Sequence, residues 1–452
     1  MNNNTHSAGL CVALSSYRSG LYSCFTRCYD ALMNLNDALL TDTGAQSFVE
    51  LSQSVFYGRT WSSLYSSCKR GTVDANALRQ LRVRHAPIPA SGKRLVLAGD
   101  ASSIARPSSP TARDRTFVHQ SNLPKGTKPV RPGWQFSFLV VPPEVLSSWV
   151  YTLDAERIAS NKTPCEVMSA QLARVLSLLP TKTASEDSSS RPLFLGDGGY
   201  GNVNFLALTA PIPCDCLVRL AKNRVLYRPK PARPEKPGRG RPPEDGARFS
   251  CQDAATQGEA DEYWSGADEK GKKIDVERWS NLHFQEQRSL PVSVLRVTRH
   301  GTLGTKRDPK VCWFLFQGED CPPLADIPGL YARRYCIEHG FRFKKQDLMW
   351  EKTHLRTPER FALWTDMVCC AENQLFLARQ EGLAQCQPWE SKHRAMSPQQ
   401  VRRGMSTIIA NLGTPARLSQ TRGNSQGRSL GTHIQPAQCY PIVCKTPQKT
   451  AN

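Results

Sequence analysis

The chain has 452 residues, of which 39% are hydrophobic and 22% are charged. That length allows two or three domains with a sizeable core. Its 59 Lys and Arg residues outnumber its 39 Asp and Glu residues, which gives a formal net charge of +20. Such an excess favours a polyanionic partner, with nucleic acid ahead of an acidic membrane surface.

The sequence predicts neither a membrane protein nor a secreted one. No apolar run approaches the ~18 residues needed to span a bilayer, and the N-terminus, MNNNTHSAGLCVAL, lacks the basic start of a signal peptide. The 16 cysteines are scattered without the spacing of a zinc site or a disulfide framework. We therefore expect reduced thiols in a cytosolic protein.

Residues 1–90 are predicted to be mainly helical. The stretch SCFTRCYDALMNLNDALL carries apolar residues at helical spacing. A second stretch, SLYSSCKRGTVDANALRQLRV, is typical of two helices separated by a break at Gly71.

From about residue 92 the pattern changes to short apolar runs that predict strands. KRLVLAGDASS is expected to be a strand ending at Asp100, GWQFSFLVV and SWVYTLDAERI two more strands, and CEVMSAQLARVLSLL an amphipathic helix. RPLFLGDGGYG then predicts a fourth strand ending at Asp197, NVNFLALTA a short helix, and CDCLVRLAKN a fifth strand. This element order is that of the ribonuclease H-like fold, in which the first and fourth strands are neighbours. Asp100 and Asp197 should therefore lie side by side at the end of the sheet.

Residues 228–249 are rich in proline and basic residues and predict an extended, polyproline-like linker. Within them RGRP, which contains Arg239 and Arg241, resembles the core of an AT-hook, whose arginines lie in a narrow minor groove. A plain basic linker is the alternative. Residues 250–320 contain three further strand-like runs, KKIDVERWS, LPVSVLRVTRH and VCWFLFQ.

The stretch YARRYCIEHGFRFKK, residues 331–345, is predicted to form one helix. Tyr331, Arg334, Glu338 and Lys345 would then share one face of that helix. A carboxylate between two cations and a phenol suits a metal ion beside a phosphate backbone. On spacing alone, a solvated helix face with an Arg–Glu pair is an equal alternative.

These four residues also match every position and gap of the Y-(2)-R-(3)-E-(6)-K signature, so the chain resembles the DDE-type insertion-sequence transposases. Asp197 to Tyr200 matches the D-x-G-[YF] run often seen around that family's second aspartate. Glu338 follows Asp197 by 141 positions, a separation that fits the β-rich insertion many of these enzymes carry.

The resemblance implies an α/β protein with a ribonuclease H-like catalytic core, a β-rich insertion, a helical N-terminal region and a basic C-terminal tail. The N-terminal region would bind DNA in such an enzyme, although a helical cap packed on the core fits the sequence equally well. The expected divisions are 1–90 (helical region), 91–227 (first part of the core), 228–320 (linker and insertion), 321–385 (second part of the core) and 386–452 (tail).

The resemblance also implies the chemistry and the partners. Two Mg²⁺ ions, which Mn²⁺ could replace, would be held by Asp100 bridging both, Asp197 on one and Glu338 on the other. The reaction would be strand cleavage at transposon ends followed by strand transfer into target DNA. The partners would be double-stranded DNA, as terminal inverted repeats and target, and a second copy of the chain in a synaptic complex on the bacterial nucleoid. The expected DNA-binding residues are Tyr331, Arg334, Lys345, Arg239 and Arg241.

Two alternatives remain. Gly196 to Gly201 satisfies the G-x-G-x-x-G dinucleotide fingerprint, with Asp215 about twenty residues further on. That fingerprint usually opens the first βαβ unit of its domain, whereas three strands and a helix precede it here, and the net charge of +20 does not help an oxidoreductase. The second alternative is a DNA-binding relative of a transposase that has kept the fold but does not cut.

Overall fold

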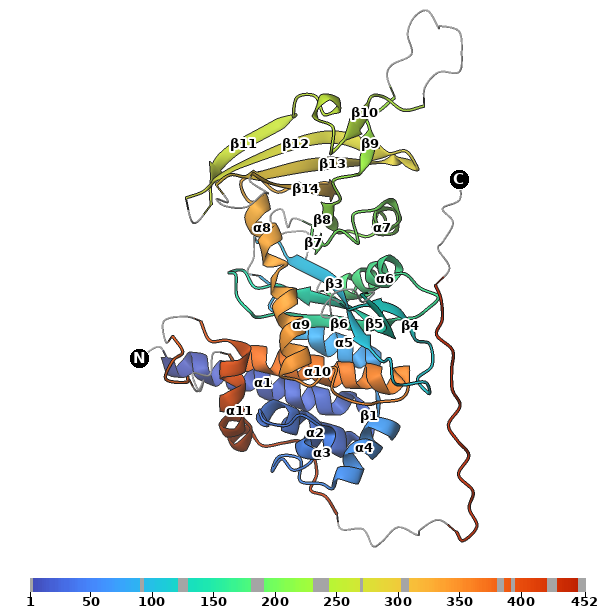
Figure 1. Cartoon of the computed structure of the whole chain (residues 1–452). Helices are drawn as coiled ribbons and strands as arrows, with labels where there is room; N and C mark the ends of the chain where they lie inside the picture. The colour runs from blue at the N-terminus through green and yellow to red at the C-terminus, as the bar shows by residue number, and fades with distance from the viewer. Residues whose placement is uncertain are drawn as a thin grey trace, which may run out of the picture.

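A computed structural model describes most of the chain and shows three regions along its long axis, a helical region, a central group of strands and the strands of the insertion (Figure 1). The described residues are 3–89, 93–120, 129–179, 191–230, 244–268, 271–301, 309–379, 386–391, 395–420 and 429–445. Arg239 and Arg241 lie outside the described residues, so the predicted AT-hook is not described by the structure.

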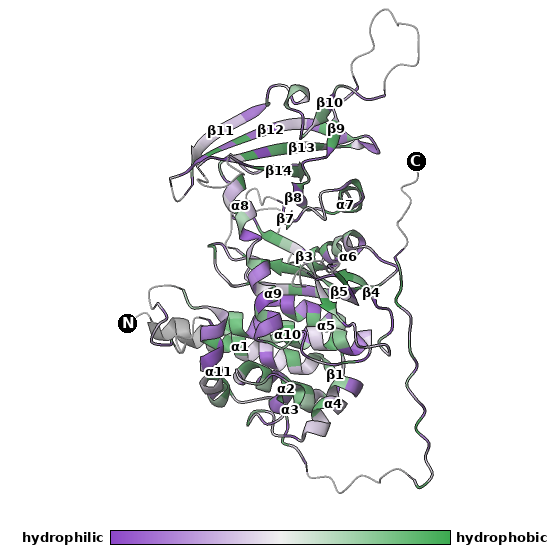
Figure 2. Cartoon of the chain, in the orientation of Figure 1, coloured by the Kyte–Doolittle hydropathy of each residue, from purple (hydrophilic) through white to green (hydrophobic). Residues whose placement is uncertain are grey.

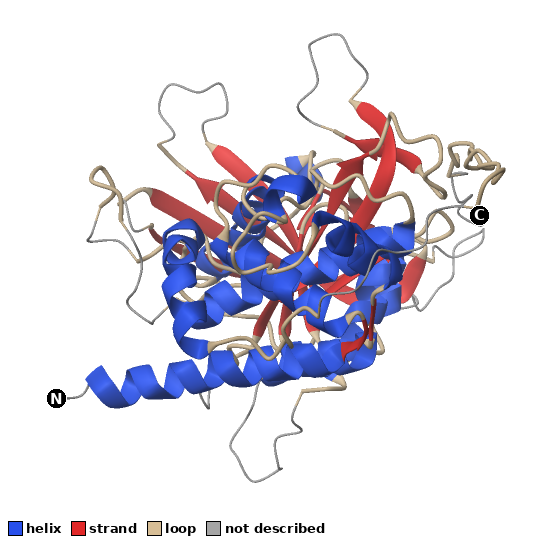
Figure 3. Cartoon of the chain, turned by 90° about the horizontal axis from the view of Figure 1, so that it is seen from below, coloured by secondary structure: helices blue, strands red, loops and turns tan. Residues whose placement is uncertain are grey.

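The helical region contains the N-terminal helices and two C-terminal ones, with α1 running along its edge (Figure 3). Buried Arg18 donates to Asp37 Oδ1 at 2.7 Å and to Gln374 Oε1 at 3.0 Å, which fixes the N-terminal helices on α10. The prediction of a mainly helical start is confirmed, and the described helices pack on the body of the molecule as a cap would. The bounds are α1 Asn3–Cys24, α2 Tyr29–Thr41, α3 Phe48–Leu51, α4 Trp61–Arg70, α5 Ala75–Arg84, α10 Pro358–Ala378 and α11 Pro398–Leu412, with the strands β1 Phe25–Arg27 and β2 Thr72–Val73.

The α11 helix lies inside the stretch 386–452, which the sequence predicts as a basic tail. Arg402 on this helix is buried and donates to the carbonyl of Leu39 at 2.9 Å. Beyond it, the extended chain returns to the sheet, where the amide of Val443 donates to the carbonyl of Arg115 at 2.8 Å. Part of the predicted tail therefore belongs to the folded body.

The central sheet has the element order that the sequence predicts. Its strands lie in the spatial order β6-β5-β3-β7-β8, in which β3 pairs parallel with β7 and antiparallel with β5. Strand β4, in the loop after β3, was not predicted; it pairs with β5. These elements are β3 Val96–Ala105, β4 Thr116–His119, β5 Val130–Val141, β6 Tyr151–Ile158, α6 Pro164–Leu176, β7 Leu193–Gly196, α7 Val203–Thr209 and β8 Asp215–Leu220.

The insertion continues the central sheet. Strand β14 pairs antiparallel with β8, so that twelve strands form one sheet from the core into the insertion. The three strand-like runs of the sequence correspond to β12, β13 and β14, which confirms those predictions. The bounds are β9 Val225–Tyr227, β10 Arg248–Ser250, η1 Ala254–Thr256, β11 Glu262–Ala267, β12 Lys273–Phe284, β13 Gln287–Arg299 and β14 Lys310–Gln317.

The expectation of a single helix over residues 331–345 is wrong. The stretch contributes to two helices, α8 Ile327–Arg333 and α9 Cys336–Gln346, with a turn between them at Arg334 and Tyr335. The amide of Arg334 donates to the carbonyl of Tyr331 at 3.1 Å, and that of Tyr335 to Ala332 at 3.0 Å. These i to i−3 bonds tighten the chain into a 3₁₀-type turn, which changes the angle between successive side chains.

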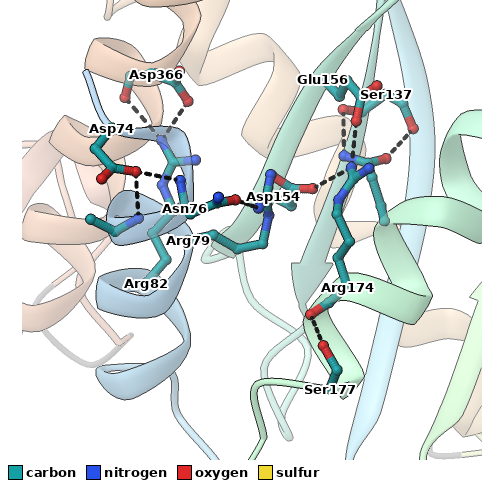
Figure 4. A network of polar contacts seen from close by, with 12 residues as sticks. Asp74, Asn76, Arg79, Arg82, Ser137, Asp154, Glu156, Arg174, Ser177 and Asp366 are labelled. Carbon is teal, nitrogen blue, oxygen red and sulfur yellow. Dashed lines mark hydrogen bonds and ion pairs between the residues drawn. The ribbon is translucent and has the colours of Figure 1, made fainter. Parts of the chain in front are cut away.

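The helical region and the central sheet are joined by an ion-pair network (Figure 4). Arg79 on α5 approaches Asp154 on β6 at 3.3 Å, and Arg174 on α6 approaches the same carboxylate at 3.2 Å. On the other side of α5, Arg82 donates to Asp366 on α10 at 2.9 Å. The Asp154 carboxylate thus connects α5 and α6 to β6, through an ion pair with Arg79 and a charge-assisted hydrogen bond from Arg174.

Hydrophobic residues concentrate on the central strands, while the helices carry both kinds of residue (Figure 2). None of the helices in the described part of the chain is long and apolar enough to cross a membrane. The cysteines from Cys24 to Cys444 are free thiols.

Candidate active site

Asp100 and Asp197 occupy matched positions on two neighbouring strands. The parallel register pairs Ala98 of β3 with Leu195 of β7, so the same offset brings position 100 level with position 197. Asp197 follows β7 directly, as predicted. Asp100 does not end its strand, because β3 continues to Ala105; this corrects the sequence prediction. Because side chains alternate along a strand, the matched positions place both carboxylates on the same side of the sheet.

Arg334 lies between two of the predicted catalytic carboxylates. Its Nη1 atom is 2.9 Å from Asp100 Oδ2, and its Nη2 atom is 3.7 Å from Glu338 Oε1. The side chain of Arg334 is 13% exposed and that of Asp100 18%, whereas that of Glu338 is 48% exposed. Arg334 therefore makes its close contact with the partly buried carboxylate of Asp100 and a longer one with the exposed carboxylate of Glu338.

Burial sets the electrostatics of this pair. Burial raises the pKa of Asp100; the Arg334 guanidinium opposes that rise and Asp197 adds to it. Burial lowers the pKa of Arg334, but Asp100 and then Tyr331 more than offset this, so the pKa of Arg334 lies above its ordinary value. A second carboxylate near a buried one needs a compensating cation, and Arg334 supplies it in this structure.

Tyr331 holds the end of strand β7. Its hydroxyl donates to the carbonyl of Gly196 at 3.2 Å, and its ring packs edge-on against Phe314 of β14 with centroids 4.5 Å apart. Burial raises the pKa of Tyr331, so the hydroxyl keeps its proton at neutral pH and can donate. Tyr331 thus connects α8 to the residue just before Asp197.

Lys345 does not share the surroundings of the other three signature residues. Its Nζ atom donates to the carbonyl of Ser103 at 3.1 Å and is 3.9 Å from Glu351. The turn at Arg334 ends the regular helical face, so Lys345 lies further along β3. The roles of Tyr331, Arg334 and Lys345 in DNA binding stay predictions.

A cavity of about 310 Å³ lies between α8, the turn after β7 and the insertion. Asp197, Tyr331, Arg334 and Glu338 line it, which brings the predicted residues together from elements far apart in sequence. Three cations that were not predicted also line it, namely Arg219 on β8, Arg299 on β13 and Lys310 on β14. Strand alternation could have found them, but only with the pairing of β8, β14 and β13 known.

A larger cavity, of about 1120 Å³, is lined by the residues around the start of β3 and the end of β5. It contains none of the predicted catalytic residues, and its walls include several prolines together with Trp149 and Met396. We therefore place the candidate site in the smaller cavity, which Asp197 and Glu338 line beside Arg334, the residue that pairs with Asp100.

The donor set fits a divalent metal chemically. Asp100, Asp197 and Glu338 supply carboxylate oxygens, which are the ligands that Mg²⁺ prefers. Within the described residues, however, no three His, Cys, Asp or Glu side chains lie close enough together to hold a metal ion. Arg334 takes the position between Asp100 and Glu338, so a cation that bound both would replace the guanidinium.

Comparison with known families identifies the class. The family described as DDE superfamily endonuclease matches residues 20–282, more than half of the chain. The chain belongs to the DDE superfamily endonucleases. The match includes Asp100 and Asp197 and ends before Glu338. A comparison with curated proteins found no match.

The family supports a nuclease-type or transposase-like function on DNA, and its members generally use divalent metals. The structure argues against the dinucleotide-binding alternative. The glycines from Gly196 to Gly201 here surround a carboxylate of the candidate site, and Asp215 is fully buried against Arg94. A buried, paired Asp215 is not available to a ribose hydroxyl.

Proposed function

We propose that this protein is a transposase that cuts DNA at the ends of a mobile element and joins those ends to target DNA. The observation that carries the proposal is that Asp100 on β3 and Asp197 just after β7 occupy matched positions of two parallel strands. Asp197, Glu338 and Arg334 line one cavity, and Arg334 is paired with Asp100. We further infer that the core is ribonuclease H-like. The spatial order β6-β5-β3-β7-β8 and the single parallel group β3-β7-β8 support this inference.

Asp100, Asp197 and Glu338 would hold the metal ions, two in number by analogy with other phosphoryl-transfer sites. Such ions activate the attacking oxygen and stabilise the leaving oxygen of an in-line displacement. The protein contributes position. The β3-β7 pairing fixes the two aspartates, and Tyr331 fixes the end of β7 through Gly196. Arg334 is near enough to contact a phosphate once it leaves Asp100, and its planar fork suits bidentate binding.

The proposal includes the assembly of the active complex. Joining two element ends requires that both be held at once, so we infer a dimer on DNA. The overall charge of +20 suits such an assembly, because a polyanion attracts and concentrates on a basic surface.

The test is strand cleavage on a duplex that carries the terminal repeat, with Mg²⁺ or Mn²⁺. Asp100→Ala, Asp197→Ala and Glu338→Ala should each abolish cleavage while leaving DNA binding largely intact. Glu259→Ala, at an exposed carboxylate of the insertion, is the matched control and should cut normally. Robust cleavage by any one of the three variants would remove that residue from the site.

One outcome supports the alternative function. Wild-type protein that binds the duplex tightly but does not cut it with either metal would be a DNA-binding relative without catalysis. The Arg334–Asp100 ion pair would then be the resting arrangement of a site that no longer accepts metal.

A further inference from the structure

The three unpredicted cations lie on one face of the extended sheet. Lys310, Cys312 and Phe314 alternate along β14 toward the cavity, and the register places Arg299 directly opposite Lys310. Arg219, on β8, lies directly opposite Phe314 of β14, and its guanidinium is 6.0 Å from the Phe314 ring centroid. The cations therefore form the sheet wall of the candidate site, facing Asp197 and Glu338 across it.

These cations differ from several neighbouring cations in their ion pairing. Arg296 is paired with Glu277, Arg278 with Glu262 and Lys273 with Asp275. By contrast, within the described part of the chain no carboxylate forms an ion pair with Arg219, Arg299 or Lys310. Carboxylates of the insertion thus neutralise Arg296, Arg278 and Lys273. No described carboxylate neutralises the three cations that face the cavity.

The pairing of Arg299 with Lys310 is unfavourable on its own. Like charges directly opposite each other on an antiparallel pair destabilise a sheet. A bound anion between the two strands would remove that repulsion. A cation pair beside a third cation, in a cavity that Asp197 and Glu338 also line, indicates a site for a phosphate group.

We propose that Arg219, Arg299 and Lys310 bind the phosphate backbone of the DNA strand that leaves the catalytic carboxylates and passes over the insertion sheet. The proposal rests on the proposed function for the identity of the ligand. It differs from the sequence prediction, which assigned DNA binding to Arg334 and Lys345 together with Tyr331, Arg239 and Arg241. Arg334 and Lys345 contact Asp100, Glu351 and the carbonyl of Ser103, whereas the sheet cations form no ion pair with the residues that the structure describes.

The first test is DNA binding against salt concentration without divalent metal, with a duplex that carries the terminal repeat. Removing one phosphate contact should lower the slope of log K against log salt by about 0.9. Arg219→Gln, Arg299→Gln and Lys310→Gln should each show a decrease of this size, and the triple variant roughly the sum. Lys222→Gln with Arg224→Gln, at exposed cations in the turn between β8 and β9, is the matched control. A triple variant with the wild-type slope, or one no lower than the control, would overturn the proposal.

The second test separates ligand binding from a structural role. If the cation pair exists for an anion, Arg299→Gln and Lys310→Gln should leave the urea midpoint of the DNA-free protein unchanged or raise it. A clear decrease in midpoint for both would show that the cations support the fold, and would contradict the proposal.

The two proposals can fail separately. Wild-type protein that binds DNA with the predicted dependence on Arg219, Arg299 and Lys310 but never cuts would refute the transposase and keep the phosphate site. Wild-type protein that cuts, with an unchanged salt slope in the triple variant, would refute the phosphate site and keep the transposase.

Discussion

Arg334 and Asp100, 234 positions apart in the chain, form an ion pair of 2.9 Å between the turn that separates α8 from α9 and the middle of β3. The pair places a guanidinium where two carboxylates of the candidate site converge. It also opposes the rise in the pKa of Asp100 that burial and the nearby Asp197 produce. The Arg334 guanidinium must move away from Asp100 whenever Asp100 binds another partner.

We expect Arg334→Ala to bind Mn²⁺ more tightly than the wild type in the absence of DNA. Removing a cation beside a carboxylate changes its affinity for other positive charges by roughly tenfold, the equivalent of about one pKa unit. Calorimetry with the DNA-free protein measures this without any need for activity. Arg342→Ala, at an exposed arginine on α9, should bind Mn²⁺ like the wild type. Equal affinity in both variants would mean that Arg334 does not compete with metal.

Tyr331→Phe should slow cleavage while leaving DNA affinity close to that of the wild type. The substitution removes only the hydrogen bond to the Gly196 carbonyl, which contributes about 0.5–1.5 kcal/mol. That bond fixes the end of β7, where Asp197 begins the next turn. Single-turnover cleavage and binding, measured side by side, check the prediction. A large loss of DNA affinity instead would show that the hydroxyl contacts DNA.

The glycines around Asp197 should differ sharply in their tolerance of a side chain. At Gly201 a Cβ atom would lie 2.2 Å from the carbonyl oxygen of Arg219, which is backbone and cannot move aside. A Cβ atom added at Gly198 would have no described residue within 4 Å. Gly201→Ala should therefore destabilise the protein by about 1–3 kcal/mol, as overpacking does, and Gly198→Ala should be nearly neutral. Urea unfolding of the two variants provides the comparison, and equal effects would contradict the packing of this turn on β8.

A buried ion pair anchors helix α9, and its removal should be strongly destabilising. Lys344 Nζ lies 2.6 Å from Glu372 Oε2 on α10, and both side chains are almost fully buried. Lys344→Ala should cost about 3–5 kcal/mol because it leaves a buried carboxylate unpaired. Replacing both residues by Met should cost much less, since no charge is then buried. Urea unfolding measures both variants, and equal losses in the single and double variants would show that packing, not charge, supports this pair.

The cost of Lys344→Ala should also depend on pH. Burial raises the pKa of Glu372 even with Lys344 present, and removing the lysine should raise it further. When the pKa of an acid is higher in the folded state than in the unfolded state, the folded protein loses stability as pH rises through that folded-state pKa. At lower pH the acid is protonated and this loss is absent. The difference in unfolding free energy between the wild type and Lys344→Ala should therefore be larger at about pH 8 than at about pH 5. A difference that does not change with pH would mean that Glu372 is not the source of the loss.

The sequence by itself determined the local elements and their order. Apolar runs of strand length produced β3, β5, β6, β7 and β8, because a strand buried on both sides must be apolar along most of its length. That order also brought together Asp100 and Asp197, since parallel neighbours align their equivalent positions. The acidic residue at 338 was found through its fixed spacing from Tyr331 and Arg334.

The tertiary structure decided what depends on contacts between distant segments. Helical spacing predicted one continuous helix at 331–345, whereas the turn at Arg334 and Tyr335 directs the Arg334 side chain to Asp100 on β3 and leaves Lys345 beside Ser103. Likewise, Arg219, Arg299 and Lys310 lie up to 91 positions apart and share a surface only because β14 pairs with both β8 and β13. Local propensity fixes the conformation of a few residues at a time. The pairing of strand edges and the neutralisation of buried charge depend on the whole chain, and they determine which side chains face the site.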